Sequence, residues 1–290
     1  MPHNLDDSVR QLLNTNLIAL ENHFDADAMF FYGPIGVPIE KFFRDAIEQL
    51  KSQNLKRERL VVLVNTGGGS AETVEKMVDI TRFHYTDVAF IVPDYAMSAG
   101  TILCMSGNEI YMDYTSSLGP IDPQVYNGKD WVPALGYLDK VNEFIEKSRS
   151  NTLTNAEFLM LQSQDLAMLS KYEQVRALSV TLLKKWLVKY KFSKWTQHSS
   201  NINKIGQPVT AQEKEDRAEM IAGILGDNKR WHLHSRPIGI NELNEVCRLK
   251  ITDYSGDLGL REKIRSYNDV AVGYISRHGF TNFLHTKLHF

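Results

Sequence analysis

Hydrophobic and polar positions follow two alternating patterns over the first 115 residues. Short apolar runs at 28–32, 60–64, 88–92 and 109–114 are typical of buried strands. The segments around them, 6–23, 39–50, 71–83 and 98–105, carry apolar residues at helical spacing. Strands that alternate with helices indicate βαβ units and a mainly parallel sheet, so we predict an α/β fold.

The second half of the chain has a different pattern. Helical spacing predicts helices over 138–148, 155–191 and 211–225. The polar stretch 193–209 is predicted to be a mobile loop or linker, and 230–270 mixes short apolar runs with turn residues. We therefore expect a mostly helical C-terminal part, packed on or completing the first half.

Composition excludes several classes of protein. The formal net charge of −2 supplies no global field for nucleic acid or anionic membrane. The sequence contains no run of about 18 apolar residues, so we expect no membrane-inserted helix. Its first residues lack the apolar core of a signal peptide. Two cysteines, Cys104 and Cys247, make no disulfide framework and suit a reducing compartment. We expect a soluble, cytoplasmic protein.

Two short motifs carry the candidate chemistry, and each follows a predicted strand. Asn65-Thr66-Gly67-Gly68-Gly69-Ser70 can bring bare backbone N–H groups close to a ligand. Ala96-Met97-Ser98-Ala99-Gly100 places a serine at the start of a helix, with small residues after it that let a substrate approach. Alone, the first motif also fits a tight turn and Ser98 also fits an N-cap. Together they provide the oxyanion-binding loop and the nucleophile of an acyl-transfer site, which predicts cleavage of amide or ester bonds.

These residues resemble a known family. The motifs at 65–70 and 96–101, with Ser-Leu-Gly-Pro-Ile-Asp-Pro-Gln at 117–124, look like the Clp-fold serine peptidases. The nearest branch is the serine dehydrogenase proteinase family, related to signal peptide peptidase A and the Clp protease catalytic subunit; His232 to Ile238 also resembles it. The resemblance implies a Clp/crotonase-like spiral of ββα units over 1–150, the catalytic core, with a helical C-terminal extension over 151–290.

The resemblance also implies roles for individual residues. Ser98 would be the nucleophile, and the N–H groups of Gly68 and Ala99, with Gly69 as a further donor, would form the oxyanion hole. At the position where the Clp protease subunit carries a histidine, this chain has Asp122, and a carboxylate is a poor base for a serine hydroxyl. Signal peptide peptidase A and its relatives use a lysine instead. Lys140 lies 42 residues beyond Ser98, at the start of a predicted helix, and is our candidate general base.

Several alternatives stay open around the base. Lys147 and Lys129 are rivals of Lys140, and Lys140 itself also fits an ordinary surface lysine. Asp122 either orients Lys140, binds substrate or stabilises a rigid Pro-Ile-Asp-Pro turn. In another alternative, the general base is His232 or His234, from late in the chain, and Arg236 binds a substrate carboxylate. The two histidines have no third ligand at matching spacing, so we expect neither a metal nor any other cofactor.

Three functional hypotheses follow. The first is a cytoplasmic serine peptidase with a Ser98–Lys140 dyad that cleaves soluble or exposed peptides. The second is an inactive Clp-fold module for peptide binding or assembly, and the third a crotonase-type acyl-CoA enzyme. The resemblance also suggests a homo-oligomer, with residues 155–192 as a contact helix.

Overall fold

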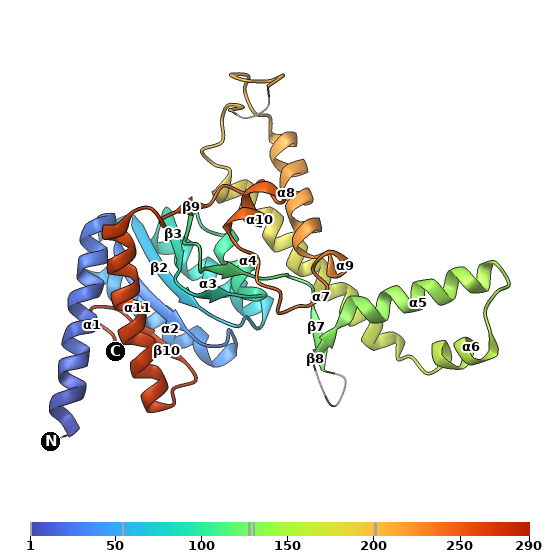
Figure 1. The fold of residues 1–290 in the computed structure, drawn as a ribbon, viewed down its shortest axis with the longest axis horizontal. Helices are drawn as coiled ribbons and strands as arrows, with labels where there is room; N and C mark the ends of the chain where they lie inside the picture. The colour runs from blue at the N-terminus through green and yellow to red at the C-terminus, as the bar shows by residue number, and fades with distance from the viewer. Residues whose placement is uncertain (1, 54, 127–128, 130, 200–201) are drawn as a thin grey trace.

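A six-stranded sheet forms the centre of the molecule in the computed structural model, which describes all residues except 1, 54, 127–128, 130 and 200–201 (Figure 1). The strand order is β10-β1-β2-β3-β5-β9. The strands are β1 (Asp27–Tyr32), β2 (Arg59–Asn65), β3 (Asp87–Val92), β5 (Glu109–Met112), β9 (Thr252–Asp253) and β10 (Phe283–His285). Every pairing in this sheet is parallel except that of β10 with β1, which confirms the predicted α/β fold.

Helices cover both faces of the sheet, because its central strands are apolar on both sides. Alternate residues of β2 point to opposite faces: Val62 packs in one core cluster and Val61 in another. The first cluster includes α2 (Val37–Gln53), α3 (Ala71–His84), α4 (Ala99–Met105) and α8 (Ala211–Leu225). The second includes α1 (Pro2–Phe24) and α11 (Leu258–His278), which lie side by side at the left of Figure 1.

A second, smaller set of strands crosses beyond the carboxyl ends of β2 and β3. The two-residue strand β4 (Tyr95–Ala96) pairs in parallel with β6 (Ser117–Leu118). On one side Ala96 bridges to Thr66, the residue after β2, and on the other Leu118 bridges antiparallel to Ile238. This layer joins four chain segments, at Thr66, β4, β6 and Ile238, and Ser98 comes two residues after β4.

The C-terminal part supplies both edges of the sheet. Strand β9 pairs with β5 at one edge and β10 pairs with β1 at the other. Along the chain, the 21-residue helix α11 lies between β9 and β10. The sequence pattern predicted only short apolar runs and turns for most of this region. It begins at the N-cap Asp257, which accepts a bond from the Leu260 N–H, and ends at Gly279 in the left-handed region at φ 67°.

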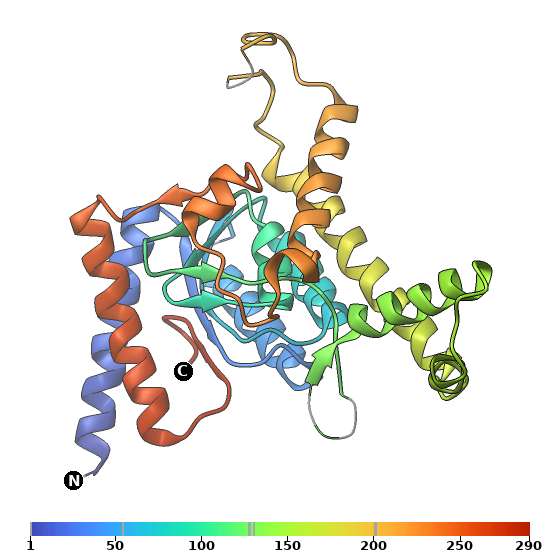
Figure 2. The same cartoon turned by 45° about the vertical axis from the view of Figure 1, so that its right-hand side comes forward.

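A helical arm projects from the body at the right of Figures 1 and 2. It follows the hairpin of β7 (Gln124–Tyr126) and β8 (Trp131–Pro133), and it consists of α5 (Ala134–Arg149), α6 (Asn155–Gln162) and the start of α7 (Leu166–Trp186). The single helix predicted over 155–191 is therefore wrong. It is broken at Ser163, Asp165 caps α7 through the Ala167 and Met168 N–H groups, and the last turn, Leu187–Lys191, is a π-helix.

The remaining helices, α9 (Asn228–Trp231) and α10 (Ile240–Glu245), are short. They lead the chain from α8 back to β9. Across the described part of the chain, none of the helices combines the length and apolar character needed to cross a bilayer.

Candidate active site

Ser98 has a strained backbone at the turn between β4 and α4. Its φ and ψ are 53° and −119°, which lie outside the regions that side-chain-bearing residues ordinarily adopt. Although Ser98 occupies the N-cap position of α4, its side chain makes no capping hydrogen bond. The ordinary capping role of a serine is therefore not the one seen here. Strain of about 1–3 kcal/mol at one residue persists where the surrounding structure holds it, and it is frequent at functional sites.

The glycine loop lies directly against this serine. A Cβ on Gly68, whose φ is 101°, would approach the Ser98 Cβ to 2.7 Å and the Ala99 nitrogen to 3.1 Å. A Cβ on Gly69, at φ 147°, would approach the Ile35 carbonyl oxygen to 1.9 Å. Both positions therefore require glycine, for the left-handed backbone and for space. Gly67 differs, because nothing lies within 4 Å of a Cβ built on it.

The N–H groups near Ser98 differ in their partners. The Gly68 N–H donates to Thr66 Oγ1 at 3.0 Å. Within the described residues, the N–H groups of Gly69 and Ala99 have no acceptor, and Ala99 is at the start of α4, where backbone donors lack intrahelical partners. Gly69 and Ala99 thus offer two open donors, and Gly68 becomes a third only where it shares or releases its bond to Thr66.

A cleft of about 640 Å³ opens over Ser98. One wall comes from the glycine loop and Ser98, another from Ile121, Pro123 and Gln124, and a third from α7, through Val175 and Ser179. His234 also lines it. The cleft lies at the carboxyl ends of the parallel strands, where open α/β sheets bind their ligands. It contains an oxyanion-type loop, a strained serine and a histidine.

Asn65 fixes the turn that carries Ser98. Its side-chain amide donates to Asp94 Oδ2 at 3.0 Å and to Asn268 Oδ1 at 2.7 Å, and its oxygen accepts the N–H groups of Asp94 and Tyr95. Its side chain thus binds Asp94 and Tyr95, directly before the motif that carries Ser98.

Lys140 lies on the arm and does not line the cleft. Its side chain is 65% exposed, and its Nζ is 2.7 Å from Glu143 Oε2. Lys147 is bound to Glu143 and Glu157, and the hydrogen bond to Glu157 contributes most to raising its pKa, the opposite of what a base requires. Lys129 is exposed and also does not line the cleft. The Ser98–Lys140 dyad stays a prediction, because Lys140 is not among the residues that line the cleft of this single chain.

Three other reactive side chains, those of Lys191, Cys104 and Cys247, are buried elsewhere. Burial lowers the pKa of Lys191 to about 8, but Lys191 does not line the cleft. Burial raises the pKa of the Cys104 thiol well above its usual range and that of Cys247 to about 11. Both cysteines are free and buried, so neither thiol is an activated nucleophile.

Asp122 and His234 form a pair at the cleft. His234 Nδ1 is 2.9 Å from Asp122 Oδ1, and the other carboxylate oxygen accepts a bond from Gln124 Nε2 at 3.0 Å. Asp122 is 2% exposed and His234 21%. Arg236 and His232 are exposed and do not line the cleft. The Asp122 carboxylate binds two side chains, those of His234 and Gln124, and its role in the turn stays a prediction.

Sequence reasoning named Asp122 and His234 separately but missed their contact and the contribution of α7 to the cleft. The pair spans 112 positions of the chain, so no local pattern reveals it. The resemblance of 232–238 to the family was the one signal that this late segment belongs near the site.

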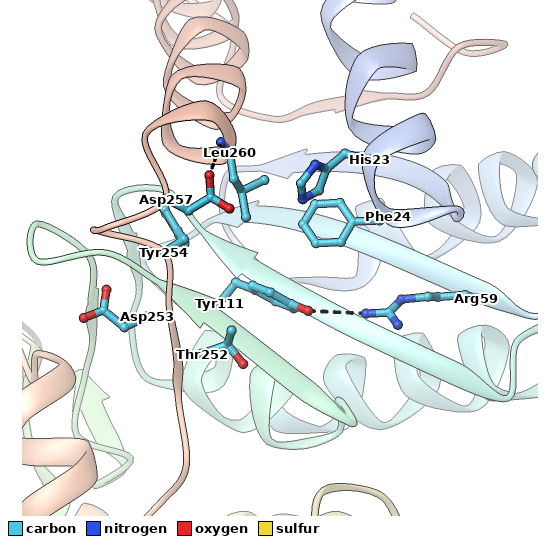
Figure 3. Close-up of a pocket in the computed structure, with 9 residues that line it drawn as sticks. All are labelled: His23, Phe24, Arg59, Tyr111, Thr252, Asp253, Tyr254, Asp257 and Leu260. Carbon is cyan, nitrogen blue, oxygen red and sulfur yellow. Dashed lines mark hydrogen bonds between the residues drawn. The ribbon is translucent and has the colours of Figure 1, made fainter.

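A second cavity, of about 360 Å³, lies near the opposite end of β2 (Figure 3). It begins at Arg59, the first residue of β2, whereas Asn65, the last, lines the Ser98 cleft. Arg59 is bound to Glu109 at 2.7 Å and faces the Tyr111 hydroxyl, which also binds Glu109. Among the described residues, the Nε of Arg59 and the hydroxyl of Tyr254, which also lines this cavity, are buried and have no hydrogen-bond partner.

The fold and the site define a class: a ClpP-like serine proteinase. The model of the family described as "ClpP-like SDH-type serine proteinase" matches residues 14–201. The chain belongs to this family.

Two uncharacterized proteins of Methanocaldococcus jannaschii are similar in sequence. MJ1495 is 32% identical over 123 residues, which are 41% of this chain and 41% of that protein. MJ0137 is 32% identical over 97 residues, 32% of this chain and 34% of that protein. The chain thus matches less than half the length of either relative.

Two solved structures are similar as well, both of mutants of the 1510-N membrane-bound stomatin-specific protease. The mutant in complex with a substrate peptide has a TM-score of 0.33 and 23% identity, and the match covers 41% of this chain and 54% of that one. The second mutant has a TM-score of 0.34 and 17% identity, over 57% and 74% of the two chains.

Proposed function

We propose that this chain is a serine hydrolase that cleaves peptide bonds through an acyl-enzyme on Ser98. The observation that carries the proposal is the strained, uncapped Ser98 held against Gly68 at the floor of the cleft. Membership of a serine proteinase family supports it.

The proposed reaction uses the open donors beside the serine. Ser98 Oγ adds to the carbonyl carbon of the substrate, and the N–H groups of Ala99 and Gly69, joined by Gly68, hold the oxygen as it becomes negative. Each such donor is worth about 3 kcal/mol of barrier. The amine leaves, and water then releases the acyl group from Ser98.

The substrate we propose is an extended peptide with an apolar side chain. Ile102, Ile121 and Val175 line the cleft and provide apolar surface beside Ser98. We propose that the reaction takes place in the cytoplasm, a setting that two free, buried cysteines suit.

Replacing Ser98 with alanine tests the proposal. The wild-type protein is expected to react covalently with a fluorophosphonate probe, and Ser98→Ala is expected to lose the labelling while its circular dichroism and melting stay close to wild type. Ser70→Ala is the matched control, since Ser70 also lines the cleft but caps α3 through the Thr73 N–H. Labelling that persists in Ser98→Ala would refute Ser98 as the nucleophile.

We also propose that the protein assembles with copies of itself through the arm. Helix α6 buries none of its residues, and Phe158, Leu159 and Met160 are all more than half exposed. Large apolar side chains exposed together on one helix are typical of an interface. Light scattering is expected to give a mass above that of one chain, and Leu159→Glu is expected to lower it. A wild-type mass equal to that of one chain would contradict the assembly.

A further inference from the structure

The Ser98 cleft has two halves of different chemistry. Ile102 lines one half and belongs to the first core cluster, whereas Tyr32 lines the other and packs against the second cluster. The cleft therefore extends across the end of the sheet, from one face to the other. We propose that the half at Tyr32 binds a lysine or arginine side chain of the peptide, through Tyr32, Tyr95 and Asp94. This inference rests on the proposed function, because it names a second feature of that substrate.

Asn65, the last residue of β2, brings the two tyrosines to the same place. In the register of β1 with β2, Tyr32 is the partner of Asn65. The Asn65 side-chain oxygen accepts the Tyr95 N–H at 3.4 Å, and the N–H of Thr66 donates to the Tyr95 carbonyl oxygen at 3.0 Å. Both tyrosines line the cleft, as Asn65 does. Backbone contacts on two sides of one residue thus set their positions.

The C-terminal segment closes this half of the cleft. Tyr32 pairs with Phe283 of β10, and Thr281, just before that strand, lines the cleft. A Cβ on Gly33 would approach the Thr281 carbonyl oxygen to 2.4 Å, so the segment packs directly on the backbone after β1. A side chain that enters this half therefore meets a wall on its outer side.

Asp94 gives this half a negative charge without a counter-charge. Its Oδ2 accepts hydrogen bonds from the Asn65 and Asn268 amides, at 3.0 and 2.8 Å, which hold the carboxylate in place. Asp94 is exposed, and within the described residues it forms no ion pair with a lysine, arginine or histidine. Arg265, three residues before Asn268 on α11, is bound to Asp113 at 2.6 Å instead. The Asp94 carboxylate is therefore available to a cation from outside the chain.

The charges around the cleft favour such a cation. Of the described residues that line it, none is a lysine or arginine, and Glu72 is the one carboxylate. Burial contributes most to raising the pKa of Tyr95, and Tyr32 and Asp94 raise it further, because each disfavours a negative charge on that hydroxyl. The same surroundings attract a positive charge, through the carboxylate and the negative faces of the rings. Lysine and arginine also carry a long apolar stem that can pack along the rings while the head reaches Asp94.

The test measures the cleavage preference of the full chain. The protein is incubated with a peptide library, prepared from a proteome with a glutamyl endopeptidase, and the cut sites are read by mass spectrometry. Wild type is expected to enrich lysine and arginine at one fixed position relative to the cut. A quenched fluorescent peptide with lysine there is then compared with the same peptide carrying norleucine. Lysine is expected to raise kcat/KM by about tenfold.

Three variants assign this preference to residues. Asp94→Asn removes the charge at constant size and is expected to lower the ratio of the two kcat/KM values to about threefold or less. Tyr95→Leu removes a ring and is expected to lower it similarly. Glu72→Gln is the matched control, since Glu72 also lines the cleft but is bound by the Ser70 hydroxyl, and it is expected to keep the ratio. A uniform loss of activity, as from a disturbed turn at Ser98, cancels in this ratio.

The outcomes separate the two claims. If wild type cleaves the library without enriching basic residues, or if Asp94→Asn keeps the full ratio, the inference is overturned and the proposed function stands. A loss in Glu72→Gln with none in Asp94→Asn would also overturn it, because the cation would then bind at α3. If wild type cleaves no peptide, the proposed function itself fails.

Salt provides a measurement that needs no variant, should Asp94→Asn not fold. The wild-type ratio is expected to fall by about threefold between about 0.05 and 1 M sodium chloride, because salt screens an exposed ion pair. A ratio that does not change with salt would contradict the role of Asp94.

Discussion

Gly68→Ala is expected to lower the rate of labelling at Ser98 by about 100-fold or more, which is the loss that accompanies one oxyanion donor. A Cβ on Gly68 would be 2.7 Å from the Ser98 Cβ and 2.7 Å from the Met97 carbonyl oxygen, both far inside van der Waals contact. The backbone at φ 101° also disfavours alanine. The loop must therefore move away from Ser98, and the free energy of unfolding should fall by about 2–4 kcal/mol as well.

Gly67→Ala provides the matched control in the same loop. Nothing lies within 4 Å of a Cβ at Gly67, and its φ is not in the left-handed region. This variant is expected to label within about threefold of wild type and to keep its stability within about 0.5 kcal/mol. Equal behaviour of the two variants would contradict the close packing of Gly68 on Ser98.

Asn65→Ala is expected to give the second large effect, on stability and activity together. The Asn65 side chain is almost fully buried, and its loss leaves the Asp94 and Tyr95 N–H groups and the Oδ1 of Asn268 without a partner. We expect the free energy of unfolding, measured in urea, to fall by about 2–4 kcal/mol. Labelling of Ser98 should slow by about tenfold or more, because the turn that positions the serine loses its support.

Asn268→Ala tests whether the effect on activity comes from the turn itself. Asn268 binds the Asn65 and Asp94 side chains but not the backbone of the turn. Its loss should reduce stability by about 1–2 kcal/mol and change labelling much less. If Asn268→Ala slows labelling as strongly as Asn65→Ala, the support of Ser98 does not run through the Asn65 oxygen.

Local pattern was enough to predict the first half of the fold. The apolar runs at 60–64 and 88–92 lie within β2 and β3, and the helix predicted over 71–83 is α3 with one more residue, because burial on a parallel sheet imposes these patterns directly. Helix α11 was missed because its apolar positions alternate with charged and small residues. Its caps, Asp257 and Gly279, were the signals that could have revealed it.

The candidate site also has parts that the sequence predicts and parts that it does not. Ser98 and the glycine loop each follow a strand within a few residues, so sequence order alone predicts that they share one edge of the sheet. The contact of Asp122 with His234 depends on a bridge between segments more than 100 positions apart. The surroundings of Lys140 depend on how the arm leaves the body, and helical periodicity within α5 contains no information on that direction.

The central claim is most directly tested by a crystal structure of the protein after reaction with diisopropyl fluorophosphate. We expect a phosphorus bonded to Ser98 Oγ, with the phosphoryl oxygen at about 3 Å from the Ala99 nitrogen and from that of Gly69 or Gly68. Phosphorus bonded to another side chain, or an oxygen turned away from the glycine loop, would contradict it.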